Sequence, residues 1–422
     1  MARLKVLISG AGIAGNALAF WLSKLGHEVS VIERFPSLRT TGLQLDLRGH
    51  AIPVLRRMGL DRAFRAKRAP EQGMQVVGSS GRRWAFFPAN KSGEGLQGFT
   101  TDWEIMRGDL CRLLYDASKD NANFIFGSGI DSFEQKDGNV QVRFTDGHTD
   151  TFDLVVGADG VWSHTRKLML GPDEPDPFQP VENLYLAYFT MPRPLRKGEE
   201  YIATTYVAPG GKGIMTRRTN SDEIQVYLSC KTDSERLRKA RRGDVEEEKA
   251  GMAEVLKGSG WITEDVLKAL PTVKDFYCER LGLVKMQAWY KGNVVLVGDA
   301  AYCPAALTGM GTSSAFVGSY ILAGEIAKHC GGPNEEQGKE GLATALRAYD
   351  HKFRPFMDQV QKGVGENTDQ WPSTSFGVTV MNLLLGVASL FRINVLGKFV
   401  LKEDVKGWDL PDYRELHGEV KL

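Results

Sequence analysis

The feature that most constrains the fold is a glycine-rich turn at the start of the chain. A short apolar run, 6–9, leads directly into Gly10, Gly12 and Gly15, which have the spacing G-x-G-x-x-G. An amphipathic run follows, with apolar residues at steps of three and four from Ala14 to Leu25. This order predicts a strand, a tight turn and a helix.

The three glycines suit a turn that holds a dinucleotide. The first permits the sharp turn, the second lets the backbone approach a pyrophosphate, and the third lets helix and strand pack closely. The helix N-terminus then offers unpaired N–H groups and a partial positive charge to the phosphates. A second apolar run, 29–32, ends at Glu33, where such a unit places its ribose-binding carboxylate. We therefore predict a dinucleotide-binding βαβ unit, the alternative being a glycine turn that only connects packed elements.

Composition and charge limit the classes of function. The chain has 422 residues, 42% hydrophobic and 25% charged, which is ordinary for a globular enzyme of two or three packed units. The net charge of +1 gives no reason to expect a nucleic acid as partner. Five scattered cysteines without a C-x-x-C pair predict a reducing, cytoplasmic location, and seven unclustered histidines predict no metal site. We also expect no secretory signal.

Two further strands end in glycine and aspartate. An apolar strand, 154–156, stops at Gly157-Ala158-Asp159-Gly160, after which Ser163 is placed to cap a helix. Another strand, 293–297, stops at Gly298-Asp299-Ala300-Ala301, and glycines 309 and 311 then open a long helix. A carboxylate at a strand tip is suited to hold sugar-alcohol hydroxyls. The alternative is a purely structural role, in which both segments are capped turns without a ligand.

The loop from Arg34 to Gly49 also has two interpretations. It is either a solvated connector or a segment whose Arg39 and Arg48 reach the phosphates of a cofactor.

Residues 175–280 differ from the preceding chain in their composition and predicted strand pattern. Several strands rich in aromatic and β-branched residues predict one antiparallel sheet, joined by a hairpin within 73–87. A mixed-charge helical stretch, 233–257, is expected to be a solvated face. The substrate-facing candidates on this sheet are Tyr188, Tyr206, Arg217 and Tyr227.

The last part of the chain is predicted to be helical. Residues 376–391 are apolar nearly all round but shorter than the roughly 20 residues that span a bilayer. We expect a helix buried on one of the domains, with two alternatives: a weak membrane or partner contact, or a transmembrane segment.

Taken together, the three strand tips resemble the single-component (class A) flavin monooxygenases of the para-hydroxybenzoate hydroxylase fold. The resemblance covers the whole chain in order. Within that group, Thr41-Gly42-Leu43-Gln44-Leu45-Asp46-Leu47 and Met106-Arg107-Gly108-Asp109-Leu110 are most similar to the tetracycline-inactivating enzymes and relatives that act on polycyclic phenols. The absence of a Trp-x-Trp-x-Ile run argues against the related flavin halogenases.

The resemblance implies roles for single residues. Glu33 would hold the adenosine ribose, Arg107 and Asp46 would lie on FAD, and Asp299 would take the ribityl and pyrophosphate region. Arg39 would meet NADPH or the flavin, and Asp159 with Gly160 would serve both nucleotides. The complete cofactor-binding set is Gly10, Gly12, Ala14, Gly15, Glu33, Arg34, Arg39, Asp46, Arg107, Asp159, Gly160, Gly298, Asp299, Gly309 and Gly311.

This chain departs from the family pattern at the third strand tip. The usual histidine is Tyr302, and the usual proline is Ala306, with Pro304 two positions earlier. The departure affects the local contacts of the flavin and not the expectation of FAD itself.

The implied reaction is hydroxylation of an aromatic or polycyclic phenolic molecule with O2 and NADPH or NADH, through a C4a-hydroperoxyflavin. No catalytic acid or base is indicated. Two alternatives remain open: a flavin reductase or dehydrogenase of the same fold, and a non-catalytic flavoprotein whose C-terminal helix docks on a partner or membrane. The protein would be a monomer or homodimer.

The expected fold is α/β, with a Rossmann-like FAD-binding domain of the GR2 type, an antiparallel-sheet substrate domain and a C-terminal helical segment. We assign 1–72, 98–175 and 281–345 to the FAD-binding domain. The substrate domain takes 73–97 and 176–280, and the C-terminal helices take 346–422.

Overall fold

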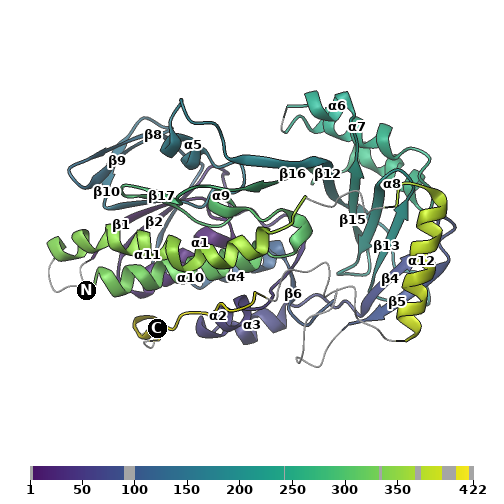
Figure 1. The fold of residues 1–422 in the computed structure, drawn as a ribbon, viewed down its shortest axis with the longest axis horizontal. Helices are drawn as coiled ribbons and strands as arrows, with labels where there is room; N and C mark the ends of the chain where they lie inside the picture. The colour runs from purple at the N-terminus through teal and green to yellow at the C-terminus, as the bar shows by residue number, and fades with distance from the viewer. Residues whose placement is uncertain are drawn as a thin grey trace.

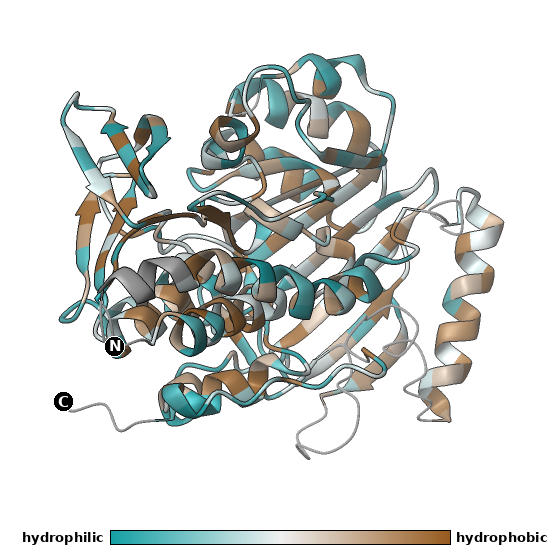
Figure 2. Ribbon diagram, turned by 60° about the vertical axis from the view of Figure 1, so that its left-hand side comes forward, coloured by the Kyte–Doolittle hydropathy of each residue, from teal (hydrophilic) through white to brown (hydrophobic). Residues whose placement is uncertain are grey.

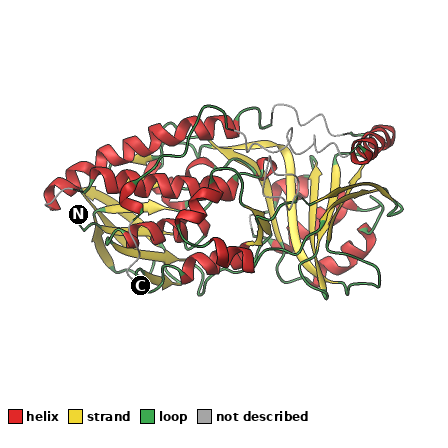
Figure 3. Ribbon diagram, turned by 90° about the horizontal axis from the view of Figure 1, so that it is seen from below, coloured by secondary structure: helices red, strands yellow, loops and turns green. Residues whose placement is uncertain are grey.

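The computed structural model describes residues 3–89, 100–241, 243–331, 335–365, 372–391 and 405–417. Two large sheets dominate the molecule and lie at its opposite ends (Figure 1). Most of the long helices cover the sheet that contains the N-terminal strand, and a single long helix borders the far edge of the other sheet (Figures 1 and 3). The predicted mixed α/β fold is therefore confirmed.

The first sheet contains the strand that precedes the glycine turn. Its order is β17-β18-β11-β1-β2-β7, and all neighbours are parallel except the edge pair β17–β18. The central strands β1, β11 and β18 are buried and almost wholly apolar, as expected for a sheet covered on both faces. Their bounds are β1 (Lys5–Ser9), β2 (Glu28–Glu33), β7 (Asn123–Phe126), β11 (Leu154–Gly157), β18 (Val294–Leu296) and β17 (Tyr290–Lys291).

Three helices pack together beside this sheet: α1 (Ile13–Lys24), α10 (Gly311–His329) and α11 (Glu335–Gln361). The contact between α1 and α10 is close, because the Ser319 hydroxyl donates to the Ala14 carbonyl at 3.1 Å. The rings of Trp21 and Tyr320 meet edge to face, with centroids 5.4 Å apart. This packing fixes the start of α10 relative to the glycine turn.

The second sheet has seven strands in the order β16-β12-β15-β14-β13-β4-β5. All neighbours are antiparallel except β4 and β13, so the expectation of a wholly antiparallel sheet is wrong at this pair. A parallel pair needs a long connection, and the chain between β5 and β13 passes through the first sheet. The strands are β4 (Gly73–Val77), β5 (Arg83–Pro88), β12 (Phe178–Pro192), β13 (Ile202–Ala208), β14 (Lys212–Arg217), β15 (Glu223–Lys231) and β16 (Tyr277–Val284).

One face of the second sheet is covered by α6 (Glu235–Lys239), α7 (Val245–Leu256) and α8 (Thr263–Ala269). Apolar side chains from these helices form a separate core with the sheet. The outer side of α6 and α7 carries exposed ion pairs, such as Arg236 with Glu247 at 3.0 Å, so the predicted solvated face is confirmed. The opposite face of the sheet is left for the cavity described below.

The remaining elements join or border the two sheets. The strand β3 pairs with β6, and a small three-stranded sheet has the order β10-β9-β8. The strands are β3 (Gln44–Asp46), β6 (Glu104–Met106), β8 (Ile130–Lys136), β9 (Asn139–Phe144) and β10 (Thr149–Phe152). The short helices are α2 (Ala51–Arg57), α3 (Asp61–Ala66), α4 (Arg107–Asp116), α5 (His164–Leu170), α9 (Asp299–Tyr302) and the 3-10 turns Leu270–Thr272, Ala306–Thr308 and Arg414–Leu416.

The helix α12 (Ser375–Leu390) lies against the edge strand β5. The Ser389 hydroxyl donates to the Phe86 carbonyl at 2.6 Å, and Asn382 is buried. The helix is largely hydrophobic (Figure 2). Its outer face is exposed, however, with Phe376 79% and Leu390 78% accessible. The expectation of a buried helix therefore holds for one face only, because apolar residues occupy both. Within the described ranges, no helix combines the length and apolar character needed to span a bilayer.

The domain boundaries remain a prediction. The boundary between 97 and 98 lies outside the described residues, and α11 already begins at Glu335, before the expected boundary at 346. The described stretch 405–417 contains only the 3-10 turn Arg414–Leu416, so this part of the expected helical segment is mostly irregular. It is fixed to α10 and α11 through Glu325, which accepts from Tyr413 and Lys352, both at 2.5 Å.

Candidate cofactor and substrate site

A cavity of about 1090 Å³ lies between the two sheets. One end is lined by the glycine turn and the two other strand tips of the first sheet. The other end is lined by β12 to β16 of the second sheet. We call these the nucleotide end and the ring end.

The glycine turn is tightly packed at two of its three glycines. Gly10 has a φ of +111°, and a Cβ on Gly15 would lie 1.9 Å from the Gly10 carbonyl oxygen. A Cβ on Gly12 would meet only the Arg107 guanidinium, at 3.9 Å. Gly10 and Gly12 line the cavity and Gly15 does not, so Gly15 serves packing while Gly12 leaves backbone open to the cavity.

Two helices begin at the nucleotide end. Neither α1 nor α10 has a side-chain cap at its first turn, and Gly12, Ile13, Gly311 and Thr312 line the cavity there. Their first N–H groups are therefore available, and each helix adds partial positive charge. Two uncapped N-termini at one cavity make a site suited to phosphates.

Charged side chains surround this end. The Glu33 carboxylate accepts from the backbone N–H of Ala11 at 3.0 Å, which ties the end of β2 to the glycine turn. Arg107 reaches the carbonyl of Thr41 at 3.2 Å. The Arg39 guanidinium lies 5.7 Å from the centre of the Tyr277 ring, which brings it near the ring end.

Asp46 lines the cavity, whereas Arg48 is buried behind it. The Arg48 guanidinium pairs with the Asp46 carboxylate at 2.6 Å. This arrangement favours a structural role for Arg48 over the phosphate contact considered from the sequence. The other predicted basic residues of the loop, Arg34 and Arg39, line the cavity.

The second strand tip is held by a network that the sequence did not indicate. The Asp159 carboxylate accepts from the Ser163 hydroxyl and from the Thr165 N–H at 2.9 Å, and Ser163 caps α5 as predicted. Arg166 is fully buried and donates to the Ala300 carbonyl at 3.0 Å and to Asp176 at 2.9 Å. Arg166 thus joins the second strand tip to the third.

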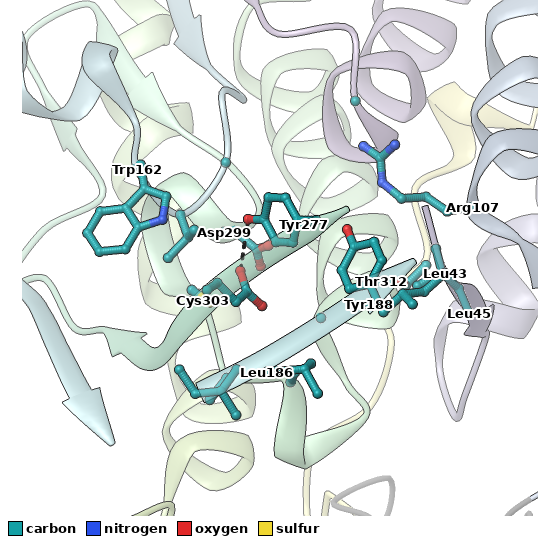
Figure 4. A pocket seen from close by; sticks show the side chains of 18 of the residues that line it. Leu43, Leu45, Arg107, Trp162, Leu186, Tyr188, Tyr277, Asp299, Cys303 and Thr312 are labelled. Carbon is teal, nitrogen blue, oxygen red and sulfur yellow. Dashed lines mark hydrogen bonds between the residues drawn. The ribbon is translucent and has the colours of Figure 1, made fainter. Parts of the chain in front are cut away.

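The third strand tip places Asp299 at the cavity wall (Figure 4). Burial raises the pKa of this carboxyl, and the neighbouring Cys303 thiol partly offsets that rise. Gly298 does not line the cavity; its φ is +68°, and an added Cβ would lie 2.8 Å from the Ala14 side chain. Tyr302, at the position of the usual histidine, is buried among aromatic rings, 4.7 Å from Trp289.

At the ring end, the strand register aligns one row of side chains across the sheet. Tyr277 pairs with Tyr188, Tyr188 with Tyr227, Tyr227 with Met215, and Met215 with Thr205. All five line the cavity. The rings of Tyr188 and Tyr277 are 5.0 Å apart and lie beside each other (Figure 4). This row forms an aromatic wall opposite the strand tips.

Tyr206 is the predicted substrate residue that fits least well. It borders the cavity, but its ring packs with Val77 and Trp261 and its hydroxyl donates to the Ser259 carbonyl. Its neighbour Thr205 belongs to the cavity-facing row, and successive side chains of a strand point to opposite faces. The Tyr206 hydroxyl is therefore turned toward the helical cover.

Arg217 lines the cavity with Tyr227 and is backed by two buried glutamates, Glu71 and Glu104. Sequence reasoning missed both glutamates, and also Gln44 beside them. Gln44 and Glu104 come together through the pairing of β3 with β6, and Glu71 joins them from the segment before β4, so no local sequence signal marked the group.

The residues at the nucleotide end fit FAD. The open backbone at Gly12, the two uncapped helices and the basic side chains match a pyrophosphate, and Glu33 and Asp299 match sugar hydroxyls. The aromatic wall lies at the far end of the same continuous cavity. Among the described residues, no group of His, Cys, Asp or Glu is arranged to hold a metal ion.

Comparison with known proteins gives the same assignment. Residues 3–363 match the family described as FAD binding domain. The chain is 51% identical over 99% of its length, and 100% of the relative's, to FAD-dependent monooxygenase asL4 of Sarocladium schorii. It is 39% identical to flavin-dependent monooxygenase eupH of Phoma sp, over 98% of each chain. The crystal structure of tetracycline destructase Tet(55) aligns with a TM-score of 0.79 at 26% identity, over 97% of this chain and 99% of that one.

The chain therefore belongs to the FAD binding domain family and is an FAD-dependent monooxygenase. The resemblance to class A flavin monooxygenases, and within them to the tetracycline-inactivating enzymes, is confirmed.

Proposed function

We propose that this monooxygenase uses NADPH or NADH and O2 to hydroxylate an aromatic or polycyclic phenolic small molecule. The observation that carries the proposal is the single cavity that joins the nucleotide end to an aromatic wall. Support also comes from the relatives, one of which is a tetracycline destructase by name. When bound, FAD would supply the redox chemistry with O2; the protein binds, orients and shields the reactants.

The nucleotide end binds through the backbone of the glycine turn and the two helix N-termini, with the carboxylates of Glu33 and Asp299 on sugar hydroxyls. Arg39 is half-buried at the edge of the cavity, next to Tyr277, and is our candidate for the contact with the nicotinamide nucleotide. Asp159 has its carboxylate engaged by Ser163 and Thr165, so we assign it to holding the strand tip, with Gly160 leaving open space beside it.

The ring end orients the substrate and excludes water. Tyr188, Tyr227 and Tyr277 offer flat faces for an aromatic ring, and Leu186 and Met215 add apolar surface. Water must be kept out, because access of solvent lets the oxygen leave as hydrogen peroxide without hydroxylated product. A polycyclic substrate would cover this wall and close the site to solvent.

One experiment tests the reaction class. Oxidation of NADPH and consumption of O2 are measured for the FAD-loaded protein with a set of polycyclic phenols. The masses of the products are determined by mass spectrometry. We expect a gain of one oxygen atom per molecule. Oxidation of NADPH without insertion of oxygen would instead support the flavin reductase or dehydrogenase of the same fold.

A second experiment tests the cofactor site. We expect Asp299→Ala to purify with less FAD than the parent, whereas Asp299→Asn, which keeps the shape and one acceptor oxygen, retains more. Undiminished flavin in Asp299→Ala would refute the role of Asp299. A colourless parent protein that cannot be reconstituted with FAD would exclude both the monooxygenase and the reductase or dehydrogenase.

We also propose that the exposed face of α12 makes a weak membrane or partner contact. Phe376, Leu384 and Leu390 are 79%, 64% and 78% exposed, which is unusual for large apolar side chains that cluster on one helix. Flotation with lipid vesicles and light scattering of the free protein would separate a membrane contact from a homodimer. A protein that stays monomeric and does not float would refute both.

A further inference from the structure

Two buried carboxylates lie behind the ring end of the cavity. The side chains of Glu71 and Glu104 are each 1% exposed, and both face Arg217. The Arg217 Nε lies 3.3 Å from a Glu71 oxygen, and its Nη2 lies 3.8 Å from a Glu104 oxygen. Among the described residues the buried Nε has no hydrogen-bond partner. The guanidinium is therefore held by ion pairing with the two carboxylates rather than by a bidentate hydrogen-bonded arrangement.

The side chain of Gln44 connects the two glutamates. Its Nε2 lies 2.6 Å from a Glu104 oxygen and 3.4 Å from a Glu71 oxygen. The Thr100 hydroxyl donates to Glu71 at 2.9 Å, and the Thr101 N–H donates to Glu104 at 3.2 Å. Because a single amide nitrogen reaches both carboxylates, the two groups lie close together in a dry environment.

Two nearby carboxylates that share one arginine cannot both be ionised without a large cost. Burial raises the pKa of both, and that of Glu104 lies well above its ordinary value. Asp46 adds a further negative charge, which Arg48 neutralises at 2.6 Å. Tyr227 stays neutral, because burial raises its pKa to about 12. With one proton on the pair of glutamates, the whole cluster is electrically neutral; without it, the cluster carries a negative charge.

The cluster also presents polar side chains at the cavity wall. Gln44, Asp46, Arg217 and Tyr227 line the cavity, whereas Glu71 and Glu104 do not. Gln44 Oε1 and Asp46 Oδ1 are buried and lack hydrogen-bond partners within the described part of the chain. Such atoms are costly unless a ligand satisfies them. They mark a polar subsite beside the aromatic wall.

We infer that Glu71 and Glu104 hold one proton between them and thereby keep Arg217 available to pair with an ionised hydroxyl of the substrate. The inference rests on the proposed function, since it specifies the phenol. The substrate class is a phenol or enol acidic enough to ionise near neutral pH, with its proton released to solvent on binding. An ionised hydroxyl also enriches the ring in electrons, as transfer of oxygen to a ring carbon requires. Glu71 and Glu104 are positioning residues, because they act through Arg217.

The test is a binding titration with alizarin, a dihydroxyanthraquinone whose colour changes when its more acidic hydroxyl ionises. Alizarin is titrated into the FAD-loaded protein across a range of pH, and the spectrum of the bound probe is recorded. We expect the ionised colour in the complex and a bell-shaped affinity profile. Affinity rises as the probe ionises and then falls by up to about tenfold per pH unit as the glutamates lose their proton.

Variants identify which group causes the loss of alizarin affinity at high pH. Glu104→Gln replaces a proton-carrying acid by an amide that cannot ionise, so we expect affinity within about threefold of the parent at neutral pH and no fall at high pH. Glu71→Gln tests the same point if Glu104→Gln does not fold. Arg217→Met should weaken binding at least tenfold and shift the bound probe to its neutral colour. Glu134→Gln, at an exposed position of β8, should behave as the parent.

The parent protein provides a check that needs no variant. Calorimetry in two buffers with different heats of ionisation should show uptake of a proton on binding at high pH, where the pair must be protonated again. A neutral bound probe, or a fall at high pH that persists in Glu104→Gln, would overturn the inference. The titration needs no turnover, so a chain that binds ionised alizarin but inserts no oxygen would contradict the proposed reaction and leave this inference standing.

Discussion

The two ends of the cavity are built in different ways. At the nucleotide end the surface includes much backbone, from a glycine turn and two uncapped helix N-termini, together with a few charged side chains. At the ring end the surface is side chains from five strands, backed by the buried group of Gln44, Glu71, Glu104 and Arg217.

This difference teaches where each kind of specificity resides. Backbone groups recognise the FAD cofactor, which the whole family shares. Their position depends only on glycine residues and on correct packing. Side chains on a sheet can change one at a time without disturbing the fold, so they are suited to distinguish substrates. Four predictions test this division, in order of decreasing effect.

The largest effect is expected at the glycine turn. The methyl group of Gly15→Ala would lie 1.9 Å from the Gly10 carbonyl oxygen, so we expect a loss of more than about 3 kcal/mol of stability and little bound flavin. The matched variant Gly12→Ala places its methyl group toward the cavity, with only Arg107 at 3.9 Å. It should change stability by about 0.5 kcal/mol or less but weaken FAD binding at least tenfold. Thermal unfolding measures the change in stability, and flavin titration measures the change in FAD affinity. Equal changes in the two variants would contradict the assignment of Gly15 to packing and Gly12 to the cofactor.

The next effect concerns the connection between strand tips. Arg166→Met removes a buried guanidinium that bonds to Ala300 and Asp176, and we expect a loss of about 3 kcal/mol. Arg143→Met, which removes an exposed pair with Asp131 at 3.7 Å, should cost less than about 0.5 kcal/mol. Denaturant unfolding of both variants compares them directly. Similar losses would show that burial of Arg166 adds nothing.

A third prediction concerns pH and the ring end. Because burial raises the pKa of Glu104, the folded chain binds a proton there that the unfolded chain releases above about pH 4.5. Stability should therefore fall as pH rises from that value through the raised pKa, by at most about 1.4 kcal/mol per pH unit. Glu104→Gln should remove this slope, so the variant gains on the parent as pH rises. Urea unfolding at several pH values measures the slope, and parallel curves would exclude the effect.

The smallest effect is expected at Tyr206. Tyr206→Phe loses the hydrogen bond to the Ser259 carbonyl on the outer side of the sheet, which should cost about 1 kcal/mol. Turnover should stay unchanged, because that hydroxyl does not face the substrate. Tyr227→Phe is the matched variant on the cavity-facing row and should raise the KM. A raised KM in Tyr206→Phe would place its hydroxyl in the site after all.

These contrasts also explain what could be predicted from the sequence. The glycine turn, the strand tips and Glu33 were found because their chemistry depends on residues next to one another in the chain. Glu71, Glu104 and Gln44 were missed because they meet only through strand pairing. Tyr206 was placed with Tyr188 and Tyr227 because the face of a strand follows from its register, which an isolated sequence does not give. The helix α12 was expected to be buried because its residues are mostly apolar. Hydropathy alone does not show how much of the helix surface the rest of the protein covers.

The packing of α1 against α10 has a consequence for the order of folding. The glycine turn is among the first segments made, yet the helix that supports it spans Gly311–His329, and β18, which completes the parallel sheet, spans Val294–Leu296. Contacts so distant in the chain are slow to form, and their late arrival leaves apolar strands exposed during synthesis. We therefore expect the nascent chain to acquire FAD only after about three quarters of it has been made.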